Sequence, residues 1–274
     1  MPIATLAAII TGDFGMDLQL RGKRVLITGA SKGIGAAAAE AFAEEGCHLR
    51  LAARSRDQLD TLGKGLSLAH GIGVVVHAVD LRKPDELAKL AHDAADIDIL
   101  VNNAGDIPRG AIDAIDDAKW RHAWELKVFG FINLTRLVYA QMKARGSGVI
   151  INDIGSAGER FDSSYICGSA GNAALMAFTR ALGGTSLADN IRVVGINPGP
   201  VGTDRHIALM KARAARELGD ENRYRELQQK LPLARPAQPR EIADLMAFLA
   251  SPRSGYTSGV IFTVDGGLSA GWTG

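Results

Sequence analysis

A tyrosine stands at the start of a stretch of small residues, SSYICGSAGNAALMAF, at positions 163–178. Small residues let another surface approach a helix closely, so Tyr165 would lie beside something packed tightly against that helix. A phenol has a pKa of about 10 and acts as an acid or base near neutral pH only when a cation stabilises its anion. The residue one helical turn later, on the same face, is the uncharged Ser169. If Tyr165 does chemistry, its cation has to come from elsewhere.

A glycine-rich turn directly follows the first apolar run of the chain, in RVLITGASKGIGAA. Gly29, Gly33 and Gly35 allow a tight turn there and let a pyrophosphate approach the backbone at the start of the next helix. The free N–H groups and the dipole of a helix start favour anions. The pattern therefore predicts a dinucleotide site, and its alternative is a plain strand-to-helix turn.

The end of the second strand carries cations rather than a carboxylate. In LAARSR, Ala53 stands where an acidic residue would accept hydrogen bonds from a free ribose 2′-hydroxyl, and Arg54 follows it. Lys32 adds a second cation inside the glycine turn. Two cations without a carboxylate favour a 2′-phosphate, and hence NADP(H). The alternative is that both are solvated surface charges.

Short β-rich runs alternate with helical stretches from Lys23 onward. The runs are RVLITG, HLRLAAR, GVVVHAVDL, DILVNNAG, GVIIND, IRVVGINPG and GVIFTVDGG. Apolar strands separated by helices predict a parallel sheet covered on both faces, which is a doubly wound α/β fold. Such a sheet binds its ligand at the carboxyl ends of the strands, near the point where strand order reverses. The motifs of this chain fall at those ends.

Composition argues against several classes of protein. The chain has 274 residues, of which 47% are hydrophobic, and a formal net charge of +1 from 31 basic and 30 acidic residues mixed along its length. It shows no electrostatic footprint for nucleic acid, and the apolar run near its start is too short to span a bilayer. Cys47 and Cys167 suit a reducing compartment such as the cytoplasm and have no metal-ligand spacing. We expect one domain over residues 16–274 and a loosely ordered extension over residues 1–15.

Five motifs in this order resemble the short-chain dehydrogenase/reductase family. They are TGASKGIG, the NNAG at 102–105, a serine followed by Tyr165, the NPG at 197–199 with Thr203 beyond it, and VDGG near the end. The resemblance covers roughly residues 18–268 and is closest to the branch of 3-oxoacyl carrier-protein reductases. It implies a Rossmann-like fold, a nicotinamide cofactor, and a homodimer or homotetramer.

The resemblance also assigns roles to residues outside the glycine turn. Asp80 and Leu81 should border the adenine, the NNAG turn should lie along the cofactor, and the segment after the NPG should meet the nicotinamide carboxamide. The cofactor site implied in this way comprises Gly29, Ser31, Lys32, Gly33, Ile34, Gly35, Arg54, Asp80, Leu81, Asn103, Ala104, Gly105, Ser169, Pro198, Gly199, Val201 and Thr203.

In similar enzymes a serine on the strand before the tyrosine bonds the substrate oxygen, while the tyrosine transfers its proton to that oxygen. Here Ser156 stands at the end of GVIINDIGS, nine positions before Tyr165, whereas family members commonly have a longer gap. Ser163 and Ser164 are too near the tyrosine and are typical turn residues. Ser156 is therefore the predicted catalytic serine, at the start of a shortened loop.

The family pattern places a lysine four residues after the tyrosine, where it holds the ribose and lowers the pKa of the phenol; here that residue is Ser169. A neutral hydrogen bond contributes about 1 kcal/mol, whereas a cation about 4 Å away contributes about 4 kcal/mol in a protein-like dielectric. Lys127, in an apolar helix expected over 120–142, stands where the family has an active-site asparagine, and we expect it to supply the missing charge. The alternatives are that Lys127 extends to solvent, and that Arg160 in the shortened loop is the cation.

Residues 204–233 have helical periodicity and mixed charge, and the resemblance implies that this segment covers the substrate. Its apolar residues Ile207, Leu209 and Met210 suggest a small-molecule carbonyl or alcohol with some hydrocarbon character.

The sequence thus predicts an NADP(H)-dependent oxidoreductase that interconverts a carbonyl and a secondary alcohol, with Ser156, Tyr165 and Lys127 as its catalytic residues. The rival hypothesis is a binding or regulatory protein that holds NADP(H) and has lost turnover together with its lysine. The serine and the tyrosine favour the enzyme, and the absence of a lysine at position 169 favours the binding protein.

Overall fold

The computed structural model describes residues 16–272, and the extension predicted for residues 1–15 lies outside the described residues. Seven strands form one sheet in the order β3-β2-β1-β4-β5-β6-β7, and all neighbouring pairs are parallel. The strands are β1 (Arg24–Thr28), β2 (His48–Ala53), β3 (Val74–Ala78), β4 (Ile99–Asn102), β5 (Gly148–Asp153), β6 (Ile191–Pro198) and β7 (Ile261–Val264). The predicted doubly wound α/β fold is confirmed.

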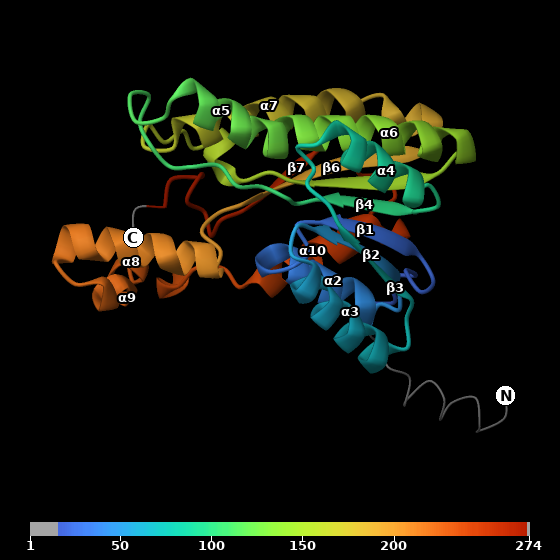
Figure 1. Cartoon of the computed structure of the whole chain (residues 1–274), viewed down its shortest axis with the longest axis horizontal. Coiled ribbons are helices and arrows are strands. Elements are labelled where there is room, and N and C mark those ends of the chain that lie inside the picture. The colour runs from blue at the N-terminus through green and yellow to red at the C-terminus, as the bar shows by residue number, and fades with distance from the viewer. Residues whose placement is uncertain (1–15, 273–274) are drawn as a thin grey trace, which may run out of the picture.

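Helices cover both faces of the sheet (Figure 1). On one face lie α2 (Gly33–Glu44), α3 (Arg56–His70) and α10 (Pro239–Ala250). On the other face lie α4 (Pro84–Asp93), α5 (Asp117–Trp124), α6 (Gly130–Arg145) and α7 (Ile166–Gly183). The remaining helical segments are η1 (Glu125–Phe129), η2 (Ser156–Gly158), η3 (Ser186–Asp189), α8 (Asp204–Leu218), η4 (Glu221–Arg223), α9 (Tyr224–Gln228), η5 (Pro232–Ala234) and η6 (Pro252–Ser254). None of the helices found between residues 16 and 272 has the length and apolarity that a membrane crossing requires.

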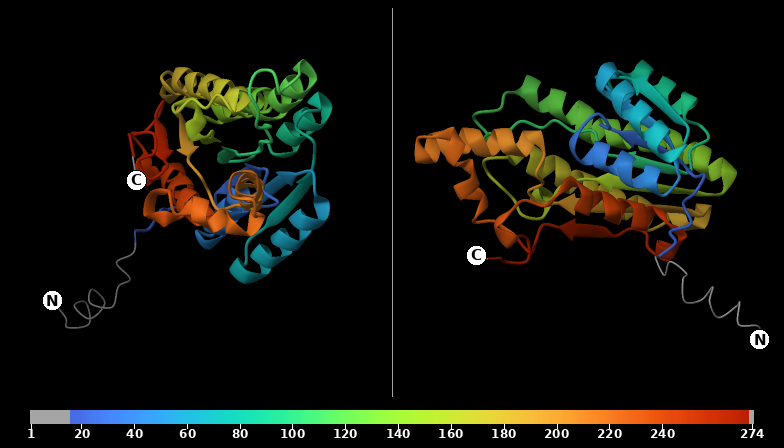
Figure 2. Two further views of the ribbon diagram at one scale, coloured as in Figure 1. Left: turned by 90° about the vertical axis from the view of Figure 1, so that its left-hand side faces the viewer. Right: turned by 90° about the horizontal axis from the view of Figure 1, so that it is seen from below.

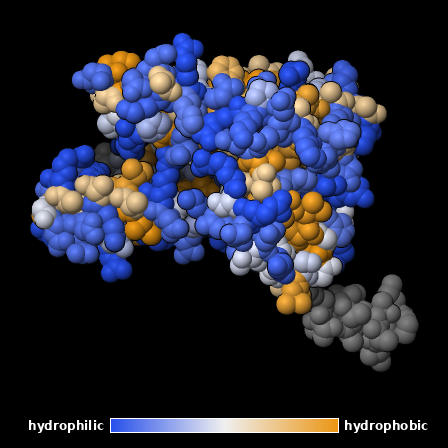
Figure 3. All heavy atoms as spheres, viewed as in Figure 1, coloured by the Kyte–Doolittle hydropathy of each residue, from blue (hydrophilic) through white to orange (hydrophobic). Residues whose placement is uncertain are grey.

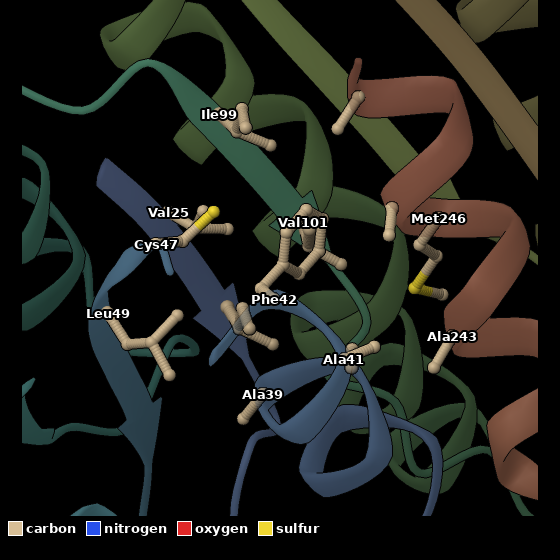
Figure 4. Packing of buried hydrophobic residues seen from close by; sticks show 14 of the residues in the cluster. Val25, Ala39, Ala41, Phe42, Cys47, Leu49, Ile99, Val101, Ala243 and Met246 are labelled. Atoms are coloured by element: carbon tan, nitrogen blue, oxygen red, sulfur yellow. The ribbon is translucent and has the colours of Figure 1, made fainter. Parts of the chain in front are cut away.

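Apolar side chains fill the space between the sheet and each helix layer. Val25 of β1, Phe42 of α2 and Met246 of α10 belong to one core cluster, part of which is drawn in Figure 4. The next residue, Leu26, enters the opposite core, where it packs in the same cluster as Leu134 of α6. Side chains alternate along a strand, so a strand covered on both faces needs an almost continuous apolar sequence. This requirement explains the unbroken run RVLIT of β1.

The strand order reverses beside β1, since the chain runs from β1 out to β3 on one side and from β4 out to β7 on the other. The glycine turn follows β1 and the NNAG turn follows β4, and these two strands are neighbours. Both turns therefore lie at the switch point, on the carboxyl edge of the sheet. The helices α8 and α9 project beyond this edge (Figures 1 and 2). The space-filling view shows a hollow between them and the rest of the molecule (Figure 3).

The single long helix predicted over residues 120–142 is interrupted. Its first part is α5, its last part is α6, and between them the segment η1 has π-helical geometry. A π-helical turn contains an extra residue, so it changes which side chains face the sheet. Lys127 lies in this turn. The apolar periodicity of the sequence does not reveal the interruption, because buried residues occur in α5, in η1 and in α6 alike.

Candidate active site

The turn after β1 presents backbone groups to the carboxyl edge of the sheet. Gly29 and Gly33 have φ values of +67° and +60°, which residues with a side chain rarely adopt. A Cβ at Gly35 would lie 2.4 Å from the carbonyl oxygen of Gly29, so the turn and the helix approach too closely for any side chain there. Lys32, the N-cap of α2, makes no side-chain cap hydrogen bond. The first N–H groups of α2 therefore lack a side-chain cap, as an anion site requires.

The end of β2 lies beside this turn, because the N–H of Gly29 donates to the carbonyl of Ala52 over 2.7 Å. The predicted phosphate-binding cations Lys32 and Arg54 are both exposed. Within residues 16–272 neither side chain has an ion-pair or hydrogen-bond partner, although nineteen ion pairs form in the same part of the chain. Two exposed cations without a protein partner beside an anion site fit a bound phosphate.

The carboxylate of Asp80, predicted to border the adenine, is bound by Arg82. The Nη2 and Nε atoms of Arg82 donate to it over 2.5 and 2.9 Å. This hydrogen bonding holds the pKa of the Asp80 carboxyl below its usual range. The charge of Asp80 is therefore balanced chiefly by Arg82 within its own turn, and the more distant Arg54 acts on the same carboxyl more weakly. The adjacent Leu81 is buried in the core beneath.

The NNAG turn is fastened to the neighbouring strands by side-chain hydrogen bonds. The Nδ2 of Asn103 donates to the carbonyl of Thr28 over 2.8 Å, and the backbone N–H groups of Asn103 and Ala104 donate to the Thr28 hydroxyl. The Nδ2 of Asn102 donates to the Oδ1 of Asn152 on β5 over 2.9 Å. These bonds fix the ends of β1, β4 and β5 relative to one another and leave Gly105 at the exposed edge.

Lys127 is buried inside the molecule, so the alternative in which it extends to solvent is wrong. Its Nζ donates to the carbonyl oxygen of Asp153, at the end of β5, over 2.8 Å. The same Nζ lies 4.9 Å from the centre of the Phe131 ring. A Cβ at Gly105 would lie 2.6 Å from the Lys127 Cδ, so the stem of the lysine passes directly under the NNAG turn. The ammonium is therefore held at the carboxyl edge, between β4 and β5.

Burial changes the proton affinity of this lysine and of its neighbour. It lowers the pKa of Lys127 to about 8, with the charge of Asp153 acting in the opposite direction. It raises the pKa of the Asp153 carboxyl to about 6, again opposed by Lys127. One oxygen of this carboxyl, Oδ1, is buried without a hydrogen-bond partner in the described part of the chain. The buried ammonium of Lys127 and the buried carboxyl of Asp153 thus lie near the end of β5, and one carboxyl oxygen still lacks a hydrogen bond from the described residues.

Tyr165 lies immediately before α7 and is half-buried. Its ring packs in a cluster with Ile107, Trp120 and Trp124, and the guanidinium carbon of Arg109 lies 5.2 Å from the ring centre. Burial raises the pKa of the phenol above its ordinary value, and the nearby positive charges of Arg205 and Arg109 act against this shift. Phenol deprotonation in this structure therefore needs more help from cations than the arginines supply.

The two predicted serines have different surroundings. Ser156 begins the short η2 segment after β5, is half-buried, and its hydroxyl makes no hydrogen bond within residues 16–272. Ser169 is buried, and its hydroxyl accepts the backbone N–H of Asp162 over 3.1 Å. Ser169 also lines a surface hollow together with Phe161 and Ile166. Its hydroxyl is thus directed at the loop before α7, although the resemblance implied a contact with the cofactor.

The shortened loop before Tyr165 exposes Arg160. The adjacent Glu159 accepts a hydrogen bond from Thr263 over 2.7 Å and lies 4.0 Å from Arg180. Glu159 therefore contacts β7 and α7, while Arg160 has no ion-pair partner in the described residues. Arg160 remains an alternative cation that no contact connects to Tyr165.

The segment after β6 also borders the carboxyl edge of the sheet, next to the glycine turn. Pro198 ends β6, and Val201 forms an isolated parallel bridge with Ala237. The Cγ2 of Thr203 would lie 3.1 Å from a Cβ at Gly33, so this segment reaches the glycine turn. The side chain of Thr203 also caps α8 by accepting the N–H of His206. Residues predicted from three separate motifs are thus brought to one edge of the sheet.

Arg205 of α8, which sequence reasoning missed, connects α8 to the NNAG turn. Its Nη2 donates to the carbonyl of Ile107 over 2.5 Å, and its Nη1 lies 3.4 Å from a carboxylate oxygen of Asp106. The helix α8 has Ile207, Leu209 and Met210 half-buried near its start. The mixed charge of 204–233 concealed the one arginine that makes this contact.

Comparisons with known proteins match most of the chain. A family model described as "Enoyl-(Acyl carrier protein) reductase" matches residues 29–269. Galactitol 2-dehydrogenase (L-tagatose-forming) of Cereibacter sphaeroides is 33% identical over 262 residues, which cover 94% of this chain and 99% of that protein. A 3-oxoacyl-(acyl-carrier-protein) reductase of Vibrio cholerae is 32% identical over 261 residues, covering 92% of this chain and 99% of that one. The crystal structure of L-sorbose reductase from Gluconobacter frateurii, complexed with NADPH and L-sorbose, matches with a TM-score of 0.88 and 35% identity, covering 94% and 100% of the two chains.

Proposed function

The chain belongs to the short-chain dehydrogenase/reductase family of oxidoreductases, as its motifs predicted, and we propose that it interconverts a carbonyl and a secondary alcohol with NADP(H). The observation that carries this proposal is the arrangement at one sheet edge of a glycine turn, two cations without a partner in residues 16–272, a serine after β5 and a tyrosine before α7. Ligands of doubly wound sheets bind at this edge.

The residues present fit a dinucleotide with a 2′-phosphate. The glycine turn and the first N–H groups of α2 would hold the pyrophosphate, and Lys32 and Arg54 would hold the 2′-phosphate. Asn103, Ala104 and Gly105 would border the middle of the cofactor. The NADPH in the structure of the Gluconobacter frateurii reductase supports this choice of cofactor. When bound, the nicotinamide supplies the hydride of the reaction.

Tyr165 and Ser156 act on the oxygen of the substrate. In the direction of reduction, the Tyr165 hydroxyl donates its proton to the oxygen as negative charge develops there, and the Ser156 hydroxyl donates a hydrogen bond to the same oxygen. The half-buried Ser156 hydroxyl makes no hydrogen bond within residues 16–272, so it is free to bond the substrate oxygen. In the reverse direction the phenolate form of Tyr165 accepts the proton of the alcohol.

We propose that Lys127 supplies further positive charge that favours the phenolate, beyond the charges of Arg205 and Arg109 that act on Tyr165 in this structure. Its ammonium uses one hydrogen bond on the Asp153 carbonyl, so its other N–H groups remain for a ligand or a water that leads to Tyr165. The arginines on either side, Arg109 and Arg205, act on the phenol in the same direction. The substrate enters beside α8, whose apolar residues suit a carbonyl compound with some hydrocarbon character.

The rival function is a protein that binds NADP(H) without turnover, and one observation favours it. Burial raises the pKa of Tyr165 and no lysine lies four residues after it, so the phenol lacks the strong acidifying contact of the family. Both functions retain the same cofactor site. They differ only in whether the cations near Tyr165 lower its pKa enough for proton transfer.

One experiment separates the two. NADPH oxidation is followed by absorbance against a panel of ketones, quinones and 3-oxoacyl thioesters, and NADPH binding is measured in parallel by fluorescence. Oxidation with at least one carbonyl class, lost in Tyr165→Phe while NADPH still binds, supports the enzyme. Tight NADPH binding with no oxidation across the panel would assign the chain to the rival. Light scattering in the same buffer measures the homodimer or homotetramer that we expect.

A further inference from the structure

The ring of Tyr165 occupies the space that a side chain at position 168 would need. A Cβ built on Gly168 would lie 2.1 Å from both Cε1 and Cζ of the tyrosine ring. Non-bonded heavy atoms do not approach within 3.0 Å in this way, so any side chain at 168 would displace the ring. Gly168 is itself buried in the first turn of α7. The phenol therefore lies over Gly168, although it is attached to the chain three residues earlier.

Tyr165 can take this position because it precedes the helix. Its φ and ψ are −139° and 38°, outside the helical region, and α7 begins at Ile166. Helical spacing places residues four apart on one face only when both belong to the helix. Counting four residues from Tyr165 therefore does not identify the residue beside its ring. Ser169, found by that count, faces the N–H of Asp162 instead.

The residue four positions after Gly168, on the same face of α7, is Asn172. This side chain is only 4% exposed, and its Nδ2 donates to the carbonyl of Gly155 over 3.2 Å. Its carbonyl oxygen, Oδ1, is buried without a partner among the described residues. Gly155 has a φ of +124°, and a Cβ there would lie 2.9 Å from the Asn172 Nδ2, so glycine is required for this contact. Gly155 directly precedes Ser156, so Asn172 fixes the turn that carries the serine.

We propose that the face of α7 turned toward the active site is formed by Gly168 and Asn172, and that Tyr165 provides its phenol by laying its ring over Gly168. Asn172 is then a positioning residue for the Ser156 turn and, through its free Oδ1, an acceptor for a hydroxyl of the bound ligand, either the ribose of the cofactor or the substrate. This inference rests on the proposed function for its chemistry. The position of the ring over Gly168 is independent of that function.

The position of the ring is tested first by stability, without any activity measurement. Gly168→Ala should lower the melting temperature in the presence of Tyr165, because the methyl group and the ring compete for one space. In the Tyr165→Ala background the same change should be neutral or stabilising, since alanine favours a helix over glycine. Gly65→Ala in α3, where nothing lies within 4 Å of the added Cβ, is the matched control and should be neutral or stabilising in both backgrounds. Equal effects of Gly168→Ala in both backgrounds would overturn the inference.

The catalytic consequence is tested by moving the phenol. Tyr165→Ala should lose turnover, and Tyr165→Ala/Gly168→Tyr should recover at least about tenfold in kcat over it, because the second variant delivers a phenol to the same space from the helix itself. A Tyr165→Ala variant as active as the parent protein would refute the proposed function and leave the stability test standing. An inactive Tyr165→Ala that the second change does not improve would refute the inference and leave the proposed function standing.

The role of Asn172 is tested by comparison with Ser169. Asn172→Leu removes the acceptor while keeping the number of side-chain heavy atoms, and it should weaken the binding of one ligand by about tenfold, as expected for one buried hydrogen bond. A rise in the Kd for NADPH assigns the contact to the ribose, and a rise in KM for the carbonyl compound alone assigns it to the substrate. Asn172→Asp, which keeps an oxygen at this position, should retain more affinity than Asn172→Leu. If Ser169→Ala weakens NADPH binding more than Asn172→Leu does, then the face of α7 that carries Ser169 meets the cofactor, and the inference is wrong.

Discussion

The end of the crevice beside β1 and β4 is lined by backbone groups, whereas the end beside β5 and α7 is lined by side chains from several elements. At the first end, the helix N-terminus and the glycine turn are local in sequence, and Asn103 braces them by bonding the Thr28 carbonyl. At the second end, Lys127 reaches from η1 to the Asp153 carbonyl, and Tyr165 lies over Gly168. The glycine turn and the start of α2 form one continuous sequence motif. A side-chain site can be assembled from different positions as long as the atoms reach the same space.

The largest effect expected at the side-chain end is the loss of the phenol hydroxyl. Tyr165→Phe keeps the ring and its packing but removes the proton donor, so kcat for carbonyl reduction should fall by about a hundredfold or more. NADPH affinity, measured by fluorescence, should stay within a few-fold of the parent protein, because the backbone end is untouched. An unchanged kcat would show that another group transfers the proton. The side-chain end would then not have the catalytic role proposed for it.

At the backbone end, the corresponding change is Gly35→Ala. The added Cβ would lie 2.4 Å from the Gly29 carbonyl oxygen, so the turn must open and the helix N-terminus must move away from its position. We expect NADPH affinity to fall by roughly tenfold to a hundredfold, in the range of one or two charge-assisted hydrogen bonds. Gly65→Ala, in open space on α3, is the control and should bind NADPH as the parent does. Retained affinity in Gly35→Ala would mean that the pyrophosphate does not use this turn.

The contrast between the two ends also explains what the sequence could predict. The glycine turn, the NNAG turn and the alternation of strands and helices follow from local patterns, because a tight turn and a doubly buried strand each demand particular neighbouring residues. The burial of Lys127 was expected from its apolar helix and is confirmed, but its bond to Asp153 joins residues far apart in the chain. The π-helical turn that carries Lys127 has no local signal.

The first turn of α7 shows the limit most clearly. The prediction of Ser169 as the residue beside the tyrosine used helical spacing counted from Tyr165, and the helix begins one residue later. Asn172 carried a weak signal, as a polar residue among the apolar and small residues in the first half of α7. Its free Oδ1 and its contact with Gly155 follow from the approach of α7 to the end of β5, which tertiary packing decides.

A smaller effect at the backbone end concerns cofactor choice. Arg54→Ala should weaken NADPH by about tenfold, toward the low end of a charge-assisted contact because the arginine is exposed and screened by solvent. NADH affinity should hardly change, since NADH has no 2′-phosphate. Arg56→Ala, at the exposed first residue of α3, whose guanidinium lies 3.9 Å from the Asp60 carboxylate, serves as the control. Equal losses for both cofactors would mean that Arg54 supports the fold and does not bind the phosphate.

The smallest effect is expected in the pH dependence of stability and tests whether the ammonium of Lys127 is buried in solution. Burial lowers its pKa from 10.5 to about 8, so between these pH values the unfolded chain binds more protons than the folded chain. Stability therefore rises with pH in this window, by at most about 1.4 kcal/mol per pH unit for one proton. Asp153, with its pKa raised to about 6, is ionised in both states here and adds no slope.

Lys127→Met should remove this rise in urea unfolding, measured as the difference from the parent protein across the window. Lys64→Met, on the exposed side of α3, should leave it in place. If the slope persists in Lys127→Met, the ammonium is hydrated in solution, and the side-chain end of the crevice has no buried cation to offer Tyr165.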